Sequence, residues 1–447
     1  MKAGGNTARD TDWPGDLLGP VSQLPAFSRL WVAFSGGLDS AMLLQVAASC
    51  HPSVTALHIN HQLQPNHQQT EQFCRRTCER LGVELVVQRV NVEVKDTGAG
   101  GLEEAARAAR YDVFRKQLGR HDLLLMAHHA DDQAETVLFR LLRGSGVNGL
   151  AGMPQKRPLG AGYLYRPWLA VSRERLEQVA GQRGLKWVED PSNISENYDR
   201  NYLRHAVLPG LKERWPGLLK RVAHTARACS ESEALSHRLA ELQWPDCSDS
   251  GQLRVSSVKV LSPLEQRNLV RWWIHRQGWR VPALSDWDQV LSDLMGAGED
   301  REPEIRGDGF TLRRYRGYLY LVPNLAVPEQ PASLEPGRKL RWGPWQLALM
   351  PAGPASTPER AREPIRVSTR RGGERLRFAG AEHSRALKTW LQEQGVPPWE
   401  RSLLPLVYRE KPGASELIAV GDLWCSEQYS GGAPASGWRL IVERDCD

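Results

Sequence analysis

The sequence predicts an α/β protein that starts with a parallel-sheet domain, followed by a small α-rich domain and a small α+β C-terminal domain. Strand-like and helix-like stretches alternate strictly over about the first two hundred residues, which is typical of βαβ units. Beyond about residue 215 helical stretches dominate, and short strand-like pieces follow them. Eight prolines then fall between residues 323 and 358, where regular helix cannot persist. These changes divide the chain into 1–215, 216–325, a Pro-rich linker at 326–358, and 359–447.

The first domain is expected to contain four strands, each followed by a helix. Apolar runs bounded by turn residues mark the strands, and helically spaced apolar residues mark the helices. In chain order the elements are strand 30–34, helix 41–48, strand 54–59, helix 67–81, strand 84–90, helix 102–118, strand 122–127 and a helix that starts at Asp131. Ligands of parallel sheets bind at the carboxyl ends of strands. The turns at Ser35 and His128 should therefore face one crevice.

The later domains are expected to be smaller. In order, we expect helices 231–241, 263–276 and 285–294, strands 309–314 and 318–322, a strand or two beside the linker, strand 365–368, helix 384–394 and strand 403–408. No internal repeat is apparent.

Composition narrows the class of protein. Hydrophobic residues make up 41% of the chain and charged residues 25%, as in ordinary globular proteins. No run reaches the roughly 20 apolar residues of a membrane span, and the N-terminus lacks the apolar stretch of a signal peptide. None of the seven cysteines lies in a Cys-x-x-Cys pair, so reduced thiols are expected. We expect a cytoplasmic protein with no membrane association and no obligatory protein partner.

Positive charge is concentrated near the C-terminus. Nine Lys and Arg residues against four Glu lie between Glu359 and Lys388, although the formal net charge of the whole chain is only +6. Such a local excess suits a polyanion such as nucleic acid. Composition alone leaves a solvated surface as an equal alternative.

The stretch Phe34-Ser35-Gly36-Gly37-Leu38-Asp39-Ser40 ("FSGGLDS") follows the first expected strand and opens the first helix. Adjacent glycines let backbone N–H groups approach a ligand closely, and a helix start favours phosphate. The two serines add hydroxyl donors. Asp39 would repel a bare phosphate, so its expected role is to hold Mg²⁺. The stretch is neither a Walker A loop nor Gly-x-Gly-x-x-Gly, and a turn without a ligand remains an alternative.

A family resemblance sharpens this expectation. "SGGLDS" directly after a first strand resembles the pyrophosphate-binding loop of the PP-loop ATP pyrophosphatases, which cleave ATP to AMP and pyrophosphate. The resemblance implies that ATP is a substrate and that Asp39 serves the accompanying magnesium. It also implies a binding site for ATP and its pyrophosphate made of Ser35, Gly36, Gly37, Leu38, Asp39 and Ser40.

Residues 128–150, "HHADDQAETVLFRLLRGSGVNGL", are closer to one family within that group. From the residues alone, a metal site, an acid–base pair or a plain acidic helix N-terminus are all possible here. The stretch resembles the tRNA(Ile)-lysidine synthetases, and the likeness extends along nearly the whole chain. The matching motifs, in the family's order, are "EEAARAARYDVF" (103–114), "RPWL" (166–169), "EDPSN" (189–193), "RNYLRHAVLP" (200–209) and the C-terminal stretch 370–408. Trp168 departs from the leucine of many members.

The resemblance implies a defined reaction. The wobble cytidine of an isoleucine tRNA with a CAU anticodon is adenylated on its C2 oxygen, and free L-lysine then displaces AMP. The lysine amine must first lose a proton, because an ammonium with a pKa of about 10.4 is no nucleophile. Asp132, together with Asp131, is the expected acceptor, and Arg107 and Arg110 are candidates for the α-phosphate or the base, with a plain surface role as the alternative.

Two further groups of residues are expected to contact the substrates. The loop that closes on lysine or the anticodon would contain Asp190, Asn193, Arg200, Asn201 and Arg204, unless these serve only as turn and cap residues. Residues expected to bind tRNA phosphates are Arg370, Arg371, Arg375, Arg377, Arg385 and Lys388. Trp390 and Trp399 are expected in the core.

The sequence argues against three other functions. A tRNA 2-thiolation enzyme of the same fold would usually carry cysteine pairs, which are missing here. A tRNA-binding protein that has lost catalysis would not need the intact "SGGLDS" turn. A PP-loop synthetase acting on small molecules would have no use for the basic C-terminal domain.

Overall fold

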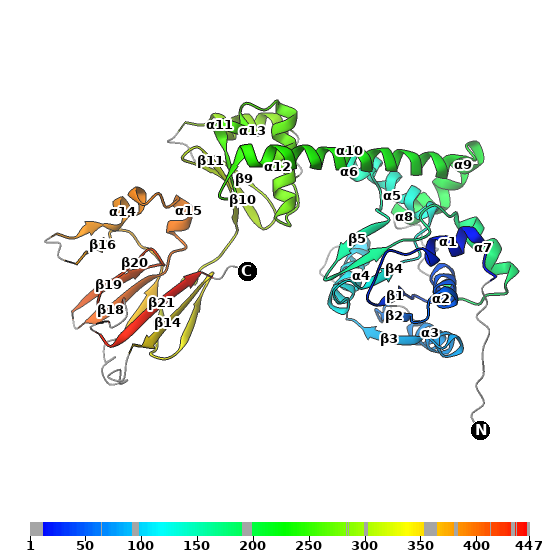
Figure 1. Cartoon of the computed structure of the whole chain (residues 1–447), viewed down its shortest axis with the longest axis horizontal. Helices are drawn as coiled ribbons and strands as arrows, with labels where there is room; N and C mark the ends of the chain where they lie inside the picture. Colours follow the sequence, from blue (N-terminus) through cyan, green and yellow to red (C-terminus); the bar gives the residue numbers. More distant parts are fainter. Residues whose placement is uncertain are drawn as a thin grey trace, which may run out of the picture. The chain divides into compact units, whose positions relative to one another are not determined.

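The structure is a computed structural model that describes residues 12–63, 65–91, 98–189, 199–282, 284, 286–298, 303–352, 364–379, 383–411, 413–430, 434 and 436–444. The chain forms two compact units, residues 1–238 and 239–447 (Figure 1). The boundary falls within the long helix α10 (Leu218–Cys247). Over the described ranges, no helix is long and apolar enough to span a membrane.

The first unit is built on a six-stranded sheet with the order β3-β2-β1-β4-β6-β5. All neighbouring strands are parallel except β5 and β6, which confirms the predicted parallel-sheet α/β domain. The strands are β1 (Leu30–Ala33), β2 (Thr55–Asn60), β3 (Glu84–Arg89), β4 (Leu123–Leu125), β5 (Lys156–Leu159) and β6 (Gly162–Tyr165). In the sheet, β2 lies on one side of β1 and β4 lies on the other side. The strand order therefore reverses between β1 and β4, and the carboxyl ends of these two strands form the topological switch point.

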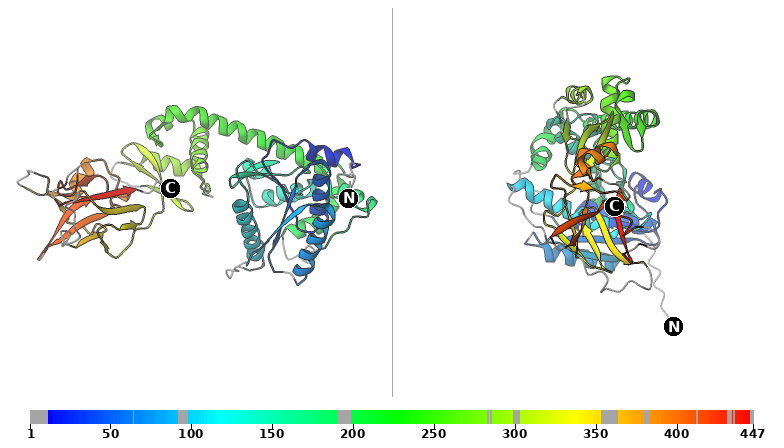
Figure 2. Two further views of the ribbon diagram at one scale, coloured as in Figure 1. Left: turned by 60° about the horizontal axis from the view of Figure 1, so that its bottom comes forward. Right: turned by 90° about the vertical axis from the view of Figure 1, so that its left-hand side faces the viewer.

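Helices cover both faces of this sheet (Figure 2). The helices of this unit before α10 are α1 (Gly15–Ser22), α2 (Leu38–Cys50), α3 (His67–Leu81), α4 (Gly98–Gln117), α5 (Ala130–Leu142), α6 (Val147–Leu150), α7 (Arg173–Gln182), α8 (Asp199–Tyr202) and α9 (Leu208–Arg214), with a π-helical turn at Leu203–Val207 between the last two. The helices expected at 41–48, 67–81 and 102–118 and from Asp131 correspond to α2, α3, α4 and α5.

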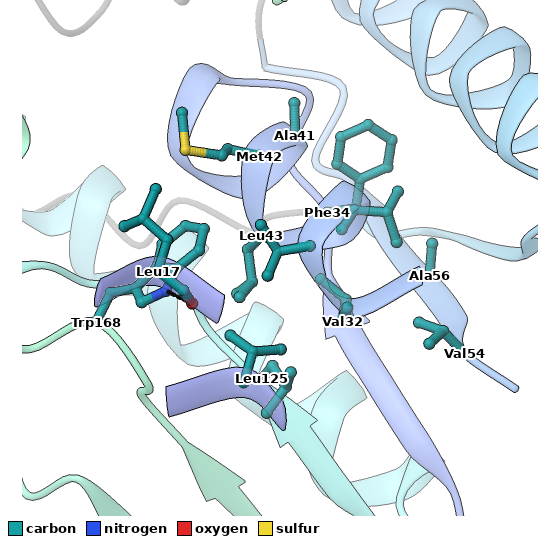
Figure 3. Close-up of a cluster of buried hydrophobic side chains, with 14 of the residues drawn as sticks. Leu17, Val32, Phe34, Ala41, Met42, Leu43, Val54, Ala56, Leu125 and Trp168 are labelled. Atoms are coloured by element: carbon teal, nitrogen blue, oxygen red, sulfur yellow. Dashed lines mark hydrogen bonds between the residues drawn. The ribbon is translucent and has the colours of Figure 1, made fainter. Parts of the chain in front are cut away.

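The side chains of β1 explain why both faces are covered. Leu30 and Val32 pack with α1, α2 and α7 on one face, whereas Trp31 packs on the other face with Phe114 of α4. Strands that are apolar on both faces are typical of buried parallel sheets. Trp168, where many family members have leucine, is fully buried in the first cluster and donates its indole N–H to the Leu17 carbonyl at 3.0 Å (Figure 3).

The second unit is largely antiparallel. Its first sheet has the order β7-β8-β11-β10-β9 and packs against α12 and α13 through residues such as Leu269, Leu291 and Leu312. The elements are β7 (Ser248–Asp249), β8 (Gln252–Arg254), α11 (Val255–Val258), α12 (Pro263–Arg276), α13 (Trp287–Gly296), β9 (Glu304–Arg306), β10 (Phe310–Tyr315) and β11 (Tyr318–Pro323). The expected helices and the strands β10 and β11 are present, and three short strands were not anticipated.

The C-terminal part of this unit holds two larger antiparallel sheets, β12-β15-β18-β19-β20 and β13-β14-β21, around one shared apolar core, and a two-stranded antiparallel sheet of β16 and β17. The elements are β12 (Ala332–Leu334), β13 (Lys339–Trp342), β14 (Trp345–Pro351), β15 (Ile365–Ser368), β16 (Arg375–Leu376), β17 (Arg385–Ala386), α14 (Leu387–Glu393), α15 (Pro398–Arg401), β18 (Leu406–Lys411), β19 (Ala414–Val420), β20 (Trp424–Cys425) and β21 (Trp438–Arg444). Trp390 and Trp399 are buried, as predicted.

The segment 326–358, expected as a linker with a strand or two, contributes the three strands β12 to β14 to this core. Trp345 and Leu347 of β14 are buried, and β14 pairs along its whole length with β21. Pro344 lies in the turn between β13 and β14, and Pro351 ends β14. Prolines at turns and strand ends remove no interior hydrogen bond from a sheet, which is why they did not prevent sheet formation here.

Candidate active site

The Ser-Gly-Gly turn joins β1 to α2, and its backbone requires glycine. Gly36 has φ +92°, and a Cβ at this position would lie 3.1 Å from Thr70 Cγ2 and 3.3 Å from Cys74 Sγ. Both neighbours belong to α3, which packs directly against the turn. The Gly36 carbonyl also accepts a hydrogen bond from the Val188 N–H at 3.0 Å. The turn is therefore fixed from two sides.

Helix α2 begins without a side-chain cap. Its N-cap is Gly37, so the N–H groups of the first helical turn have no capping acceptor. The two serines brace the turn: the Ser40 hydroxyl lies 2.9 Å from that of Ser35, donates to the Gly37 carbonyl at 3.0 Å, and accepts from the Ser35 N–H at 3.2 Å. An uncapped helix start behind a braced turn has the backbone donors and the dipole direction that suit an anion.

Asp39 lies in the first turn of α2. One carboxylate oxygen, Oδ1, is buried and has no hydrogen-bond partner among the described residues. The other, Oδ2, lies 3.8 Å from His129 Nε2 and 3.9 Å from an Arg173 guanidinium nitrogen. Burial raises the pKa of Asp39, and the charges of His129 and Arg173 oppose the shift. A buried carboxylate oxygen without a donor fits a divalent cation.

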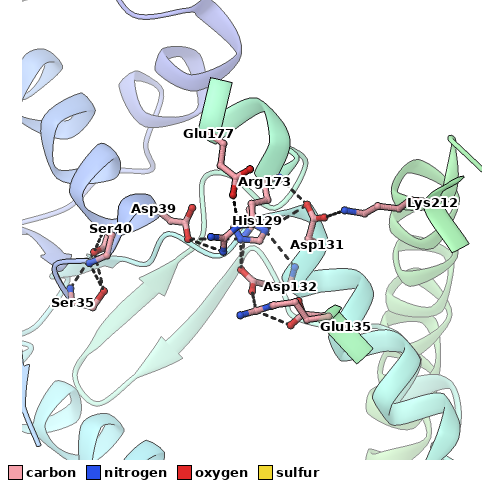
Figure 4. Close-up of polar contacts among 12 residues, drawn as sticks. Ser35, Asp39, Ser40, His129, Asp131, Asp132, Glu135, Arg173, Glu177 and Lys212 are labelled. Atoms are coloured by element: carbon pink, nitrogen blue, oxygen red, sulfur yellow. Dashed lines mark hydrogen bonds and ion pairs between the residues drawn. The ribbon is translucent and has the colours of Figure 1, made fainter. Parts of the chain in front are cut away.

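His129, at the end of the β4 turn, caps α5. Its Nδ1 accepts a hydrogen bond from the backbone N–H of Asp132 at 3.4 Å. In return, the Asp132 carboxylate accepts a hydrogen bond from the backbone N–H of His129 at 3.0 Å. His129 Nε2 lies 3.4 Å from that carboxylate and points toward Asp39 (Figure 4). The turns at Ser35 and His128 therefore lie side by side, as expected for turns that follow neighbouring strands of a parallel sheet.

Arg204 ties the carboxylates of α5 together. Its guanidinium lies 3.0 Å from Asp132 Oδ1 and 2.6 Å from Glu135 Oε1. Burial raises the pKa of Glu135, and Arg204 partly offsets this. Burial also favours the neutral form of Asp132, but the pKa of Asp132 is nevertheless lowered. The causes are the charges of His129 and His128, the hydrogen bond from the His129 backbone and the charge of Arg204. Asp132 is thus an ionised carboxylate at the edge of the crevice.

Asp131 occupies a different environment. Its side chain is 7% exposed, and its Oδ1 forms an ion pair with Lys212 of α9. Its Oδ2 accepts a hydrogen bond from the backbone N–H of Arg173 at 2.8 Å. Both carboxylate oxygens thus hold α7 and α9 against α5. Each oxygen of Asp131 therefore already has one protein partner, and the catalytic role of Asp131 stays a prediction.

His128 is held in one protonation state. Burial, with smaller contributions from nearby arginines, lowers its pKa to about 3 even though Asp132 opposes the shift. The Arg166 Nε–H donates to His128 Nδ1 at 3.2 Å, which assigns the proton of the neutral ring to Nε2. His128 therefore presents an N–H donor at neutral pH.

Arg107 and Arg110, predicted for the α-phosphate or the base, lie on α4 close enough for their charges to act on His128. The Arg107 guanidinium stacks on the Tyr111 ring at 5.1 Å from its centroid, and Arg157 stacks on the same ring at 5.0 Å. These arginines add positive charge beside the crevice.

Comparison with known proteins places this site in a family. A PP-loop domain model matches residues 17–211, a TilS substrate binding domain model matches 253–320, and a TilS substrate C-terminal domain model matches 365–442. The tRNA(Ile)-lysidine synthase of Alkalilimnicola ehrlichii is 39% identical over 96% of this chain and 97% of its own length. That of Pseudomonas aeruginosa is 41% identical over 92% of each chain. The chain belongs to the tRNA(Ile)-lysidine synthase family.

Membership of the tRNA(Ile)-lysidine synthase family confirms the predicted resemblance and the use of ATP. Solved structures similar to this chain include the U34-tRNA thiolase NcsA from Methanococcus maripaludis, at 16% identity, a TM-score of 0.41, and coverage of 48% of this chain and 79% of that one.

Within the described residues no cluster of three or more His, Cys, Asp or Glu side chains is arranged to hold a metal ion by itself. Cys74 and Cys78 are unpaired, and burial raises the pKa of Cys78 to about 12, so its thiol is inert at neutral pH.

The other predicted residues have different outcomes. Asp190 and Asn193 lie outside the described residues. Arg204 lies in the site, and Arg200 and Asn201 lie on α8, just before the π-helical turn that contains Arg204.

Five of the six predicted tRNA-binding residues are exposed, namely Arg371, Arg375, Arg377, Arg385 and Lys388. Three of the six have protein partners: Arg370 pairs with Glu374 at 3.4 Å, Arg375 donates to Ser384 Oγ at 2.7 Å, and Arg385 pairs with Glu393.

The sequence assigns no role to three residues of the site. Glu135 is not one of them, because it belongs to the acidic group at the start of α5 from which a metal site or an acid–base pair is expected, one helical turn beyond Asp131 and Asp132. Arg166, Arg173 and Lys212 gave no local signal, because each reaches the site from a distant segment of the sequence.

Proposed function

We propose that this chain is a tRNA(Ile)-lysidine synthase that ligates free L-lysine to C2 of the wobble cytidine of isoleucine tRNA with a CAU anticodon. ATP is converted to AMP and pyrophosphate. The observation that carries the proposal is the intact pyrophosphate turn opposite the ionised Asp132, in a chain similar to such synthases over almost its whole length.

In the first step, the C2 oxygen of cytidine attacks the α-phosphorus of ATP, and pyrophosphate leaves. The pyrophosphate oxygens would be bound by the uncapped N–H groups at the start of α2 and by the hydroxyls of Ser35 and Ser40. Asp39 is the residue that would hold Mg²⁺, because its Oδ1 is buried and without a partner. Mg²⁺ would supply charge neutralisation on the phosphates. Arg107, Arg110 and the His128 N–H are positioned to stabilise the α-phosphate or the base.

In the second step, the lysine amine attacks C2, and AMP leaves with the former C2 oxygen. The amine must first give up a proton. Asp132 is the proposed acceptor, because its side chain is 19% exposed whereas that of Glu135 is 5% exposed. Glu135 and Arg204 orient Asp132 through the contacts described above. The loop that includes Asp190, Asn193, Arg200 and Asn201 is proposed to close over lysine or the anticodon.

The proposed partners follow from this reaction. The tRNA phosphates would be bound by the basic residues of the C-terminal domain, whose core includes the strands β12 to β14 of segment 326–358 as well as the strands that follow residue 359. Since tRNA, ATP and free lysine meet in the cytoplasm, we propose that location. No protein partner is needed for the chemistry.

The test is AMP release by the purified full chain, with ATP, isoleucine tRNA of CAU anticodon and lysine each supplied or withheld, followed by mass analysis of the wobble nucleoside. A lysine adduct of cytidine is expected only when all three are present. AMP release without a modified cytidine would reject the assigned substrate and leave the pyrophosphatase chemistry intact. A sulfur-containing nucleoside after addition of a sulfur donor would favour the thiolation alternative.

A further inference from the structure

Arg166 is a buried arginine beside the candidate active site. It directly follows β6, and His128 follows β4, so the two residues leave the carboxyl ends of neighbouring parallel strands. Arg166 is 2% exposed, and among the described residues no acidic side chain forms an ion pair with it. Burying a guanidinium without a counter-ion is costly. The contacts of Arg166 should therefore explain why a charge stands at this position.

The guanidinium of Arg166 holds two groups at once. Its Nη1 donates to the Pro154 carbonyl at 2.8 Å, which fixes the end of the loop before β5. Its Nε donates to His128 Nδ1 at 3.2 Å. In the part of the chain that the structure describes, this is the only hydrogen bond of the His128 side chain. The orientation of the ring therefore depends on Arg166.

The contact with the loop does not by itself require a charged side chain. Gln133 of α5 holds the neighbouring residue of the loop, Met153, without a charge: its amide accepts from the Met153 N–H at 2.7 Å and donates to the Met153 carbonyl at 3.1 Å. The contact with His128 does use the charge, because a positive neighbour disfavours a second proton on the ring. Burial lowers the pKa of His128 to about 3, and the charge of Arg166 adds to the shift.

We propose that Arg166 is a positioning residue that fixes His128 as an Nε2–H donor for the adenylation step. The inference rests on the proposed function, in which the His128 N–H stabilises the α-phosphate or the base. A guanidinium only donates, so Nδ1 must accept and the ring proton stays on Nε2. A donor that is oriented before the reaction stabilises the charge that develops in the transition state. Because Arg166 is almost fully buried, it acts on the substrate through His128.

The first test observes the His128 ring directly. The full chain is labelled with ¹⁵N in its histidines, and the His128 signals in nitrogen NMR spectra are those that His128→Asn loses. At pH 7 the wild type is expected to show a neutral ring with its proton on Nε2. Arg166→Met is expected to lose this single state and to share the proton between Nδ1 and Nε2. Arg166→Lys keeps a charged donor and should retain the proton on Nε2.

Arg140→Met is the matched control. Arg140 donates to the carbonyls of Gly149 and Gly152, in the same loop, at 2.9 and 2.8 Å, but it does not contact His128. Its replacement should loosen the loop and leave the His128 signals as in the wild type. Altered His128 signals in this control would assign the effect of Arg166 to the loop and reject a direct role.

A double-mutant cycle tests whether Arg166 acts through His128. The measured quantity is the rate of pyrophosphate release in a single turnover with ATP and isoleucine tRNA, without lysine. Arg166→Met and His128→Asn are each expected to lower this rate about 10- to 100-fold. The double variant should be slower than His128→Asn by no more than about 2-fold. Arg166→Lys should recover most of the loss.

The proposal is overturned if the His128 proton of the wild type lies on Nδ1, or if the losses of the two single variants multiply in the double variant. If Arg166→Met does not fold, the spectra of the wild type and of Arg166→Lys decide. Either contrary result alongside normal lysidine formation by the wild type would reject only the role of Arg166. A wild type that forms no lysidine would reject the proposed function, whereas the spectra would still show whether Arg166 sets the state of the ring.

Discussion

Among the residues that the structure describes, two Gly-Gly turns follow a strand, and their surroundings differ in how they treat negative charge. After Gly36-Gly37 the chain enters an uncapped helix, and Asp39 leaves one carboxylate oxygen without a donor. After Gly372-Gly373 the side chain of Glu374 folds back onto the turn and occupies its N–H groups. The first turn is therefore open to a multiply charged ligand such as pyrophosphate. The second is already filled, so only the side chains around it can bind an anion.

The largest effect that separates the two turns is expected from Asp39→Asn. Loss of the proposed magnesium carboxylate should reduce AMP release about 10²- to 10³-fold. Burial raises the pKa of Asp39 in the folded protein above its ordinary value of 3.8, so at neutral pH its charge opposes folding. Asp39→Asn should therefore unfold at the same or a higher urea concentration than the wild type.

Asp112→Asn is the control for Asp39→Asn, because Asp112 is an exposed aspartate of α4 that pairs with Lys116 at 2.7 Å. It should retain full AMP release. An Asp39→Asn variant that is both active and less stable would contradict the role given to the first turn.

Replacing one glycine in each turn should give intermediate and unequal effects. Gly36→Ala combines a left-handed backbone with contacts to Thr70 and Cys74 at 3.1 and 3.3 Å, whereas a Cβ on Gly372 meets nothing within 4 Å. We expect the free energy of unfolding to fall by about 2–3 kcal/mol for Gly36→Ala and by about 1 kcal/mol for Gly372→Ala, measured by urea denaturation. The KM for ATP should rise only in the first variant. Equal losses in both would show that the packing of α3 against the first turn is unimportant.

The smallest effect is expected in how the free energy of unfolding depends on pH. The pKa of His128 is lowered from 6.5 to about 3 by burial and the nearby arginines. Since the unfolded chain protonates this histidine below pH 6.5 and the folded chain does not, the ring reduces stability progressively as the pH falls from about 6.5 toward 3. His128→Asn should therefore lose less unfolding free energy than the wild type between pH 7.5 and pH 5. An identical loss in both proteins, or a protonated His128 ring in nitrogen NMR spectra at pH 5.5, would be inconsistent with the buried neutral ring.

The parts of the site that the sequence predicted are local in the chain. The turn at Ser35 and the start of α5 both follow apolar strands, and the rule for parallel sheets brings such turns together. Arg173 and Lys212 escaped prediction because they bind Asp131 from 42 and 81 residues away, and nothing in their own neighbourhood signals that contact.

In the second unit the errors have a different origin. The prolines around Trp345 suggested a linker, yet they lie in turns and at strand ends. The strands β7, β8 and β9 contain only two or three residues each, which is too short for a period-two pattern to be visible. Their pairing with β10 and β11 is a tertiary effect.

The central claim is that the C2 oxygen of cytidine is adenylated before lysine displaces it. The most direct measurement uses isoleucine tRNA that carries ¹⁸O at C2 of the wobble cytidine, with mass analysis of the AMP released in the presence of ATP and lysine. The account predicts AMP heavier by two mass units, in an amount equal to the lysidine formed. Unlabelled AMP alongside lysidine would contradict adenylation at that oxygen.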